Sequence, residues 1–526
     1  MDSSRQKPVS RRKRAASGLF AGFGTTGVTM LVSFVVTPVI LRFLGREAYG
    51  TWAIIAQLVG YVTVVDIGMG SGVQAYVSQL AHKGDKQTLG QILSTGVLVE
   101  LLFGVVFIGI GLALLPFLSH LVGAENVPLS IIRFTFVVAV FSRAFQALVS
   151  VFEMYLMGHQ FIATCQYIGL GAYLLQSGLM VVLMYFGFGL LALPYSMLAS
   201  EVATLLVELV LMRRLTPGAR CSPRLVRKAW LKKLVNFSAW GVAGRAASHL
   251  VHNTDNLVIG HFLGASQVTT YVLTRRLPEL VRLQLVDRIV RAVRPGLGDL
   301  FGRGQFGPLQ RTFTQGMRAF LAFSVCSALL IGFVAERFLA LWVGPINYGG
   351  PVLVVVTAAT LVVGSLFRWS AAVLSAALDV KSIALVRLVE GVLNLGLSIS
   401  FVKMGLGLVG VALGTLVSSA LTSSGYLTLR ALRACRMGVG GFVRDVLPRT
   451  LVLAVAMATT CRLLAACQPL ARTSWWSLGG YVALAGLAAL AWCILLGLDR
   501  GERIALHTTL VRRMTRAKAL PADGLP

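Results

Sequence analysis

Apolar runs long enough to cross a bilayer recur through almost the whole chain, from Leu19 to Leu498. A transmembrane helix needs roughly 20 consecutive apolar residues. The runs are continuous rather than alternating, which excludes a closed β-barrel. Hydrophobic residues make up 56% of the chain and charged residues 13%, more apolar surface than a soluble globule could bury. The sequence therefore predicts an all-α integral membrane protein.

About fourteen transmembrane helices are predicted. The eighth of them is heavily charged, and the thirteenth is short. The spans are 19–41, 50–72, 91–117, 130–152, 161–185, 188–212, 234–262, 268–293, 313–341, 351–377, 383–403, 407–429, 449–466 and 474–497.

Short sequence matches recur at a nearly constant spacing and indicate an internal repeat. The matched segments are 43–45 with 262–264, 187–190 with 405–408, and, more loosely, 121–123 with 341–344. Because an even number of helices separates the copies, the repeats should be parallel and related by an axis along the membrane normal. We expect two six-helix lobes that rock around a central cavity, followed by a C-terminal helix pair.

The basic residues give the predicted orientation. A formal charge of +28 would suggest nucleic acid in a soluble protein, but here the bases gather between or beyond the apolar runs. There they set topology and contact anionic lipids, so both termini should be cytoplasmic and no nucleic acid partner is expected. The predicted order is a basic N-terminal tail (1–18), an N-lobe (19–212), a basic cytoplasmic linker (213–233), a C-lobe (234–429), a cytoplasmic loop (430–448), the helix pair (449–498) and a cytoplasmic tail (499–526).

Enzyme and cofactor motifs are missing from the sequence. It contains no GxxxxGK[ST], HExxH or GxSxG motif, and its seven cysteines are scattered without a CxxC. We therefore expect no catalytic residues, no cofactor, no metal site and no disulfide framework. An enzyme within the membrane, such as a glycan polymerase, is the alternative, but it should carry a large outside loop.

Polar residues follow one face of the seventh predicted helix. They are spaced seven, four, three and four residues apart: Ser238, Arg245, His249, His252 and Asn256. The corresponding face of the first helix, at the spacing of the repeat, is mostly neutral and polar, with Thr26, Met30, Ser33 and Thr37. Ionisable groups at membrane depth are expensive unless they face water or a bundle interior. We therefore expect this stripe to face the cavity.

The eighth predicted helix adds further charges. Arg275, Glu279 and Arg282 share a face, with Arg276 about 100° away, and Pro278 should kink the helix. Glu279 can pair with one of the arginines, which leaves a net positive charge. Arginines prefer anions because the guanidinium binds phosphate through a planar fork. The alternative is a shallow helix whose arginines reach back to the membrane surface.

Other charged groups at membrane depth are weaker candidates. Further cavity residues are Arg143 with Gln146 and Ser150, and Arg368 with Ser375; Arg387 with Glu390 and Asn394 is more consistent with an internal ion pair. The acids Asp66, Glu100, Glu153, Glu201 and Asp255 could carry a coupling ion or pair with nearby bases. Asp66, Asp255 and Glu279 are the predicted coupling or gating residues.

Two stretches resemble a known family. Residues 41–52 (LRFLGREAYGTW) with 66–70 (DIGMG), and residues 255–264 (DNLVIGHFLG) with Tyr271 and Arg276, resemble bacterial polysaccharide flippases. These are the O-antigen and exopolysaccharide exporters of the multidrug/oligosaccharidyl-lipid/polysaccharide superfamily. Pro295 and the stretch Gly405–Gly414 also fit, and the resemblance covers about residues 15–430.

The resemblance implies a V-shaped, two-lobed protein that flips an undecaprenyl-pyrophosphate-linked oligosaccharide across the bacterial inner membrane by alternating access. Arg276 and Asp255 match the family by position. Membrane lipids, a polysaccharide polymerase and export machinery are the implied partners. Two alternatives remain: a cation-coupled multidrug antiporter, which the basic cavity disfavours, and a peptidoglycan-precursor flippase.

Overall fold

A computed structural model describes residues 11–62, 69–81, 85–218, 221–467 and 474–497. Every regular element in these ranges is helical, and no strand occurs within them. The prediction of an all-α membrane protein is therefore confirmed. The chain divides into two compact units, residues 1–272 and 273–526, and the division lies inside helix α9. The predicted lobe boundary at 213–233 stays a prediction.

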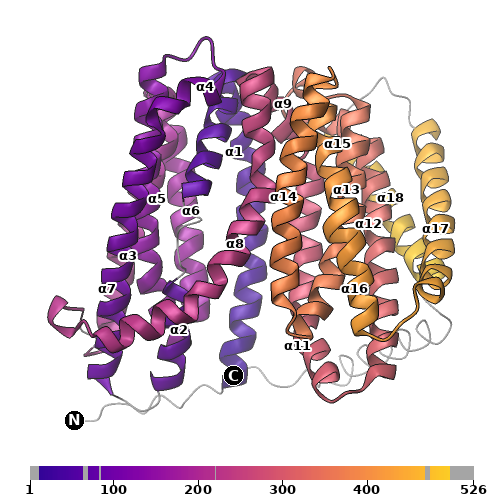
Figure 1. The fold of residues 1–526 in the computed structure, drawn as a ribbon. Helices are drawn as coiled ribbons and strands as arrows, with labels where there is room; N and C mark the ends of the chain where they lie inside the picture. The colour runs from indigo at the N-terminus through magenta and orange to yellow at the C-terminus, as the bar shows by residue number, and fades with distance from the viewer. Residues whose placement is uncertain (1–10, 63–68, 82–84, 219–220, 468–473, 498–526) are drawn as a thin grey trace, which may run out of the picture. The chain divides into compact units, whose positions relative to one another are not determined.

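The first unit is built from long helices that pack side by side, with α8 crossing them obliquely (Figure 1). Helix α5 packs against α3 and α7, and α6 packs against α1 and α7. The elements are α1 (Arg11–Val62), α2 (Met69–Leu80), α3 (Lys86–Leu114), α4 (Leu118–Val122), α5 (Leu129–Gly158), α6 (Ile162–Tyr185), α7 (Ala192–Leu215), α8 (Lys228–Leu263) and α9 (Ala265–Thr274).

The family-like stretch 41–52 ties helices of the first unit together. The backbone turns sharply at Gly45, where φ is 76° and ψ is 172°. Beyond the turn, the Arg46 Nη2 donates to Thr270 Oγ1 at 2.8 Å, and the Glu47 carboxylate accepts from the amide of Asn126. A Cβ on Gly50 would collide with the Ala265 carbonyl oxygen, so only glycine permits this approach of α1 to α9. These contacts give the stretch a structural role.

The second unit centres on α13, which packs against α11, α12, α15 and α16. An apolar core gathers around Trp369 of α13, whose indole N–H donates to the Phe313 carbonyl at 2.9 Å. Its elements are α10 (Arg276–Val281), α11 (Asp287–Gly302), α12 (Phe306–Trp342), α13 (Pro351–Ala376), α14 (Val380–Lys403), α15 (Gly407–Ser419), α16 (Leu427–Ala434), α17 (Val439–Cys467) and α18 (Trp475–Trp492). Among the described residues of this unit, π-helical turns occur at Arg282–Val286, Ala420–Tyr426 and Cys493–Gly497.

Eleven helical stretches of the described residues are long and apolar enough to cross a membrane. The first two predicted spans appear there as one stretch, Gly24–Tyr61, because the helical hydrogen bonding continues on both sides of the turn at Gly45. The seventh predicted span is α8, which has 36 residues; its side chains from 236 to 253 lie outside the described residues. The eighth, 268–293, is divided among α9, α10, the π-turn at Arg282–Val286 and α11.

Backbone geometry supports the predicted internal repeat. Residues with positive φ recur at the spacing of the sequence matches: 45 with 264, 123 with 344, 160 with 378, 187 with 405, 189 with 407, and 218 with 436. Gly187 and Gly405 have φ values of 83° and 84°, and Gly189 and Gly407 have 52° and 53°. Helices α6 and α14 both have 24 residues, and their starting points have the same spacing as these glycines. A single helix–turn pattern therefore occurs twice in the chain.

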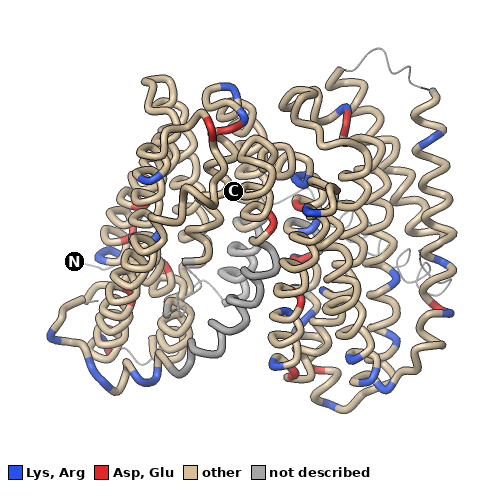
Figure 2. The backbone as a smooth tube through the Cα atoms, turned by 45° about the horizontal axis from the view of Figure 1, so that its top comes forward, with Lys and Arg blue, Asp and Glu red and all other residues tan. Residues whose placement is uncertain are grey.

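Basic residues gather at one end of the first unit. Figure 2 shows them along the loop between α7 and α8, where Arg213 and Arg214 occupy the last turn of α7. Figure 1 places α4 at the opposite end of the same unit. This distribution agrees with a cytoplasmic loop at 213–233, and the orientation itself stays a prediction.

Candidate functional site

The helix is interrupted where the eighth span was predicted, close to Pro278. Proline has no backbone N–H and cannot bond to the carbonyl four residues earlier. Helix α9 accordingly ends at Thr274, and α10 starts at Arg276, with the Glu279 amide bonded to the Arg275 carbonyl at 3.0 Å. The predicted irregularity at Pro278 is thus confirmed as a break in the helix. Residues 273–303 carry seven arginines against three acids, so this segment is strongly basic.

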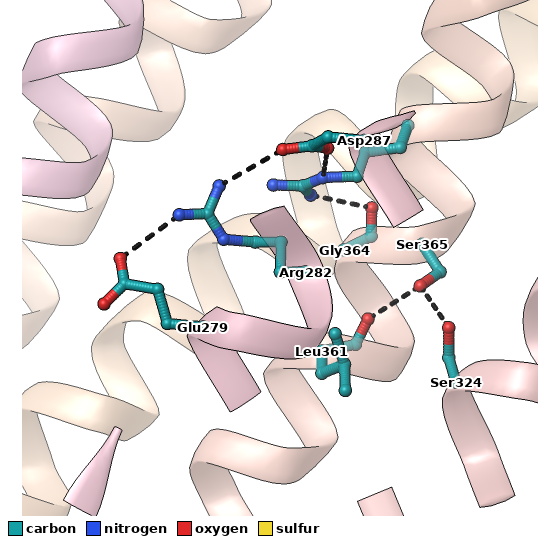
Figure 3. Close-up of polar contacts among 8 residues, drawn as sticks. Glu279, Arg282, Asp287, Ser324, Leu361, Gly364 and Ser365 are labelled. Atoms are coloured by element: carbon teal, nitrogen blue, oxygen red, sulfur yellow. Dashed lines mark hydrogen bonds and ion pairs between the residues drawn. The ribbon is translucent and has the colours of Figure 1, made fainter. Parts of the chain in front are cut away.

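A π-helical turn follows α10 and brings two opposite charges together. The Asp287 amide bonds to the Arg282 carbonyl, five residues earlier, instead of the usual four. The wider turn places the two side chains on one face, with Arg282 Nη1 3.8 Å from Asp287 Oδ2. On its other side Arg282 contacts Glu279 at 3.2 Å (Figure 3), which confirms that Glu279 pairs with one arginine.

A second arginine reaches the same carboxylate from another helix. Arg368 of α13 lies 2.5 Å from Asp287 through its Nε and also donates to the Gly364 carbonyl at 3.2 Å. Asp287 therefore bridges two arginines that are far apart in sequence (Figure 3). The expected grouping of Arg368 with Ser375 is wrong: the Ser375 hydroxyl bonds to the Ala371 carbonyl and accepts from Arg294 instead.

A buried ion pair extends this group. Arg387 Nη1 and Glu390 Oε2 lie 2.8 Å apart and their residues are 6% and 1% exposed, which confirms the internal pair. Arg387 also lies 4.8 Å from the centre of the Phe367 ring, and it interacts electrostatically with Arg282 and Arg368. Asn394 accepts from Ser398 and Thr415, so it ties α14 to α15. We name Glu279, Arg282, Asp287, Arg368, Arg387 and Glu390 the arginine cluster.

The structure also places the other predicted residues of the second unit. Arg275 and Arg276 are half-buried at the break between α9 and α10. They start the same basic segment as Arg282, so three of the predicted cavity arginines share one short stretch.

Only some of the predicted site residues of the first unit are described by the structure. The side chains of Arg245, His249 and His252, and the whole of Asp66, lie outside the described residues. Asn256 is half-buried on α8. Arg143 is exposed on α5 and acts electrostatically on Glu201.

Asp255 has a structural partner. Its carboxylate is buried, with the residue 1% exposed, and accepts a hydrogen bond from the Tyr271 hydroxyl at 2.8 Å. Both residues belong to the stretches that carry the family resemblance. The contact joins α8 to α9, so it shows a structural role for Asp255, and a gating role stays a prediction.

Two acids that matter were not anticipated. Asp287 was missed because an ideal α-helix directs residues five apart to different faces, and the sequence did not reveal the π-turn. Glu208 of α7, which is buried, was missed although it follows Glu201 by seven residues, which is two helical turns and hence the same face. That spacing was the available signal.

Comparisons with known proteins agree with this architecture. The profile of a family described as "Polysaccharide biosynthesis protein" matches residues 39–344. The "Uncharacterized membrane protein EpsK" of Bacillus subtilis (strain 168) is 22% identical over 416 residues, covering 77% of this chain and 81% of that protein.

Solved structures show the same fold. The lipid II flippase MurJ in an inward closed conformation matches with a TM-score of 0.65 at 12% identity, covering 90% of this chain and 97% of that one. An inward-facing multidrug resistance MATE family transporter of the MOP superfamily matches with a TM-score of 0.64 at 16% identity, covering 80% and 100%. The chain therefore belongs to the polysaccharide biosynthesis protein family and is a multi-pass membrane protein with the fold of MOP-superfamily transporters.

Proposed function

We propose that this protein is a flippase that moves a polyprenyl-pyrophosphate-linked oligosaccharide from the cytoplasmic to the outer leaflet by alternating access. The observation that carries the proposal is the arginine cluster of the second unit. Arginines at membrane depth are costly, and a diphosphate headgroup offers a reason for them because each guanidinium can donate two parallel hydrogen bonds to it.

The cluster is suited to an exchange of partners. Arg282 and Arg368 share one carboxylate, Asp287, and its contact with Arg282 is long at 3.8 Å, while Glu279 contacts Arg282 from the other side. The acids keep the arginines ordered and partly neutralised, which limits the penalty of two charges in an apolar surrounding. A diphosphate can then replace Asp287 and Glu279 at the guanidinium groups. The excess arginines of residues 273–303 favour an anion over a cationic drug.

The proposal also covers the membrane, the orientation and the partners of the protein. The protein would lie in the bacterial cytoplasmic membrane with both termini inside, and would hand its product to polysaccharide polymerase and export machinery for O-antigen or exopolysaccharide assembly. Reporter fusions after Gly187 and Arg220 test the orientation. The first should report outside and the second inside, because the linker is rich in bases.

The transport test uses proteoliposomes with the whole protein. Flipping of a fluorescent polyprenyl-pyrophosphate oligosaccharide is compared with flipping of a lipid-linked muropeptide and with uptake of a cationic dye. Arg368→Ala should slow flipping about 10- to 100-fold, which corresponds to one charge-assisted hydrogen bond of about 1.5–3 kcal/mol. Arg368→Lys should recover only part, because an ammonium lacks the planar fork.

Arg303→Ala is the matched control, since Arg303 pairs with Asp299 on the exposed end of α11. Its flipping rate should stay at the wild-type level. Uptake of the dye with no flipping of the saccharide lipid would reject the proposal in favour of a drug antiporter. Preference for the muropeptide would instead favour a peptidoglycan-precursor flippase.

A further inference from the structure

Helices α5 and α7 carry two rows of polar groups in matching register. Gln146 and Glu153 are seven residues apart on α5, and Glu201 and Glu208 are seven apart on α7. The two helices pack against each other and run in the same direction, because α6 lies between them in the chain. Gln146 meets Glu201, and the equal spacing brings Glu153 to the level of Glu208 two turns on.

In the first pair, Gln146 and Glu201, the polar side-chain atoms find hydrogen-bond partners in part. Gln146 Nε2 donates to Glu201 Oε1 at 2.6 Å, and Arg143 acts electrostatically on the same carboxylate. Glu201 thus has a donor and a base, which together stabilise its ionised form. The Gln146 carbonyl oxygen is buried and accepts no hydrogen bond from the described residues.

In the second pair, Glu153 and Glu208, the described residues supply neither a donor to Glu208 Oε2 nor a nearby base. Glu208 is 1% exposed, and its Oε2 accepts no hydrogen bond from the described residues. It interacts electrostatically with Glu153 and Glu201, both of which are acids, and Glu153 in turn interacts with Glu201. Cys165 of α6 interacts with both Glu153 and Glu208. Within the described part of the chain, no base contributes to the electrostatic environment of Glu153 or Glu208.

The helices around the pair carry further titratable side chains, which include Tyr61 on α1, Tyr76 on α2, Glu100 on α3, Tyr155 on α5 with His159 just after it, Tyr167 on α6, and Arg213 and Arg214 at the exposed end of α7. Of these, the two arginines are permanently charged, and they lie five and six residues beyond Glu208 in the last turn of the helix. They are exposed to solvent there, so their charge is screened and does not replace a partner inside the membrane.

Two neighbouring carboxyl groups inside a membrane cannot both ionise without a cation between them. In the described part of the chain, no three His, Cys, Asp or Glu side chains converge closely enough to hold a metal ion. We propose that Glu153 and Glu208 share one proton and form a proton-binding site between α5 and α7 of the first unit. The buried acceptor of Glu208 and its acidic neighbours carry this assignment.

Proton release changes the packing of the two helices. With the proton bound, the pair carries a single negative charge and can form a carboxyl–carboxylate hydrogen bond. Without the proton, two like charges face each other across α5 and α7 and favour their separation or hydration. Coupling of this change to substrate movement rests on the proposed flippase function, whereas the proton site itself does not.

Infrared spectroscopy of the purified whole protein in lipid tests the site without any substrate. The wild type should show the C=O stretching band of a protonated carboxylic acid at neutral pH, and the band should vanish at alkaline pH. Glu208→Gln should remove the band, because the half-buried Glu153 ionises once its partner is an amide. Glu153→Gln should retain a band at a shifted frequency, because the Glu208 carboxyl then faces an amide.

Glu125→Gln is the control, since Glu125 lies in the exposed loop before α5, and it should leave the band unchanged. An absent band in the wild type, or a band that neither Glu208→Gln nor Glu153→Gln alters, would overturn the proposal. Loss of the band on adding Na⁺ but not K⁺ at constant pH would also overturn it, in favour of a sodium site. A normal band together with a negative flipping assay would reject the transport proposal alone.

Discussion

Helices α6 and α14 have the same length and the same flanking turns, yet α14 is charged at positions where α6 has small, uncharged residues. At the spacing of the repeat, Arg387 and Glu390 of α14 correspond to Gly169 and Ala172 of α6. On the next helix the difference reverses, because Glu201 and Glu208 of α7 correspond to Ser419 and Tyr426. The two copies therefore share their turns and the length of α6 and α14, whereas each has its own charged positions.

The two copies also stabilise those charges differently. In the second unit Arg387 and Glu390 form a buried salt bridge, whereas at the corresponding place in α6 Ala172 lines an apolar groove of about 520 Å³ shared with α7. In the first unit the acids of α5 and α7 interact with one another, and Arg143 acts on Glu201. Charge inside the membrane is balanced by ion pairs in one unit and, we infer, by a proton in the other.

Replacing a glutamate by glutamine in each unit, Glu390 in the second and Glu208 in the first, tests this contrast most directly. The larger effect should come from Glu390→Gln. It leaves the Arg387 charge buried without its carboxylate, which should lower the free energy of unfolding by about 3–5 kcal/mol. Thermal unfolding in detergent measures the loss. The double variant Arg387→Met/Glu390→Leu should recover most of it, and a wild-type melting temperature in Glu390→Gln would refute the importance of the pair.

Asp287→Asn should have an intermediate effect. It weakens contacts to both Arg282 and Arg368, and we expect a loss of about 1.5–3 kcal/mol of stability. It should also leave Arg368 without its acid and Arg282 with Glu279 alone, so inorganic pyrophosphate should raise the melting temperature of the variant more than that of the wild type. Asp299→Asn, on the exposed part of α11, is the control and should respond as the wild type does.

A smaller effect is expected at Asp379, whose pair with Arg430 replaces the apolar Phe161 and Met212 of the first unit. Burial acts to raise the pKa of Asp379, but the hydrogen bonds to its carboxylate, above all from Arg430, outweigh burial, so the pKa lies below its usual range. The pair therefore stabilises the fold above the ordinary aspartate pKa of about 4, and this stabilisation is lost as the pH falls further.

Melting temperatures of the wild type and Asp379→Asn as a function of pH check this expectation. The wild type should be the more stable at pH 7 by less than the difference seen for Glu390→Gln. The two curves should converge in acid. A gap that persists or widens in acid would mean that Asp379 acts by something other than its charge.

Glu208→Gln should change stability the least, by under about 0.5 kcal/mol at neutral pH, because an amide resembles the protonated acid in shape and charge. Thermal unfolding again gives the value. A loss as large as that of Glu390→Gln would show that Glu208 is ionised and paired, and would remove the contrast between the two units.

Much of the fold could be predicted from the sequence, and the predictions that were wrong or missing share a cause. Hydropathy predicted the helices, and recurring glycines predicted the repeat, because both depend on local composition. Spacing along a helix also predicted an arginine partner for Glu279 and the pair Arg387–Glu390. Arg368 was assigned the wrong neighbour because its partner, Asp287, comes from another helix through an irregular turn. Such a contact depends on tertiary packing, which no periodicity encodes.

The π-turn at Arg282–Val286 can be viewed as an α-helix lengthened by one residue. Winding the same residues as a regular α-helix, with none deleted, would rotate α11 by about 100° relative to α10. Asp287 would then leave the face of Arg282, and Arg368 would lose its acid although none of the three residues had changed. The contacts of the cluster thus depend on the winding of the helix as much as on the identity of its residues. A relative with one residue fewer here would need its acid four positions after the arginine to keep the same contacts.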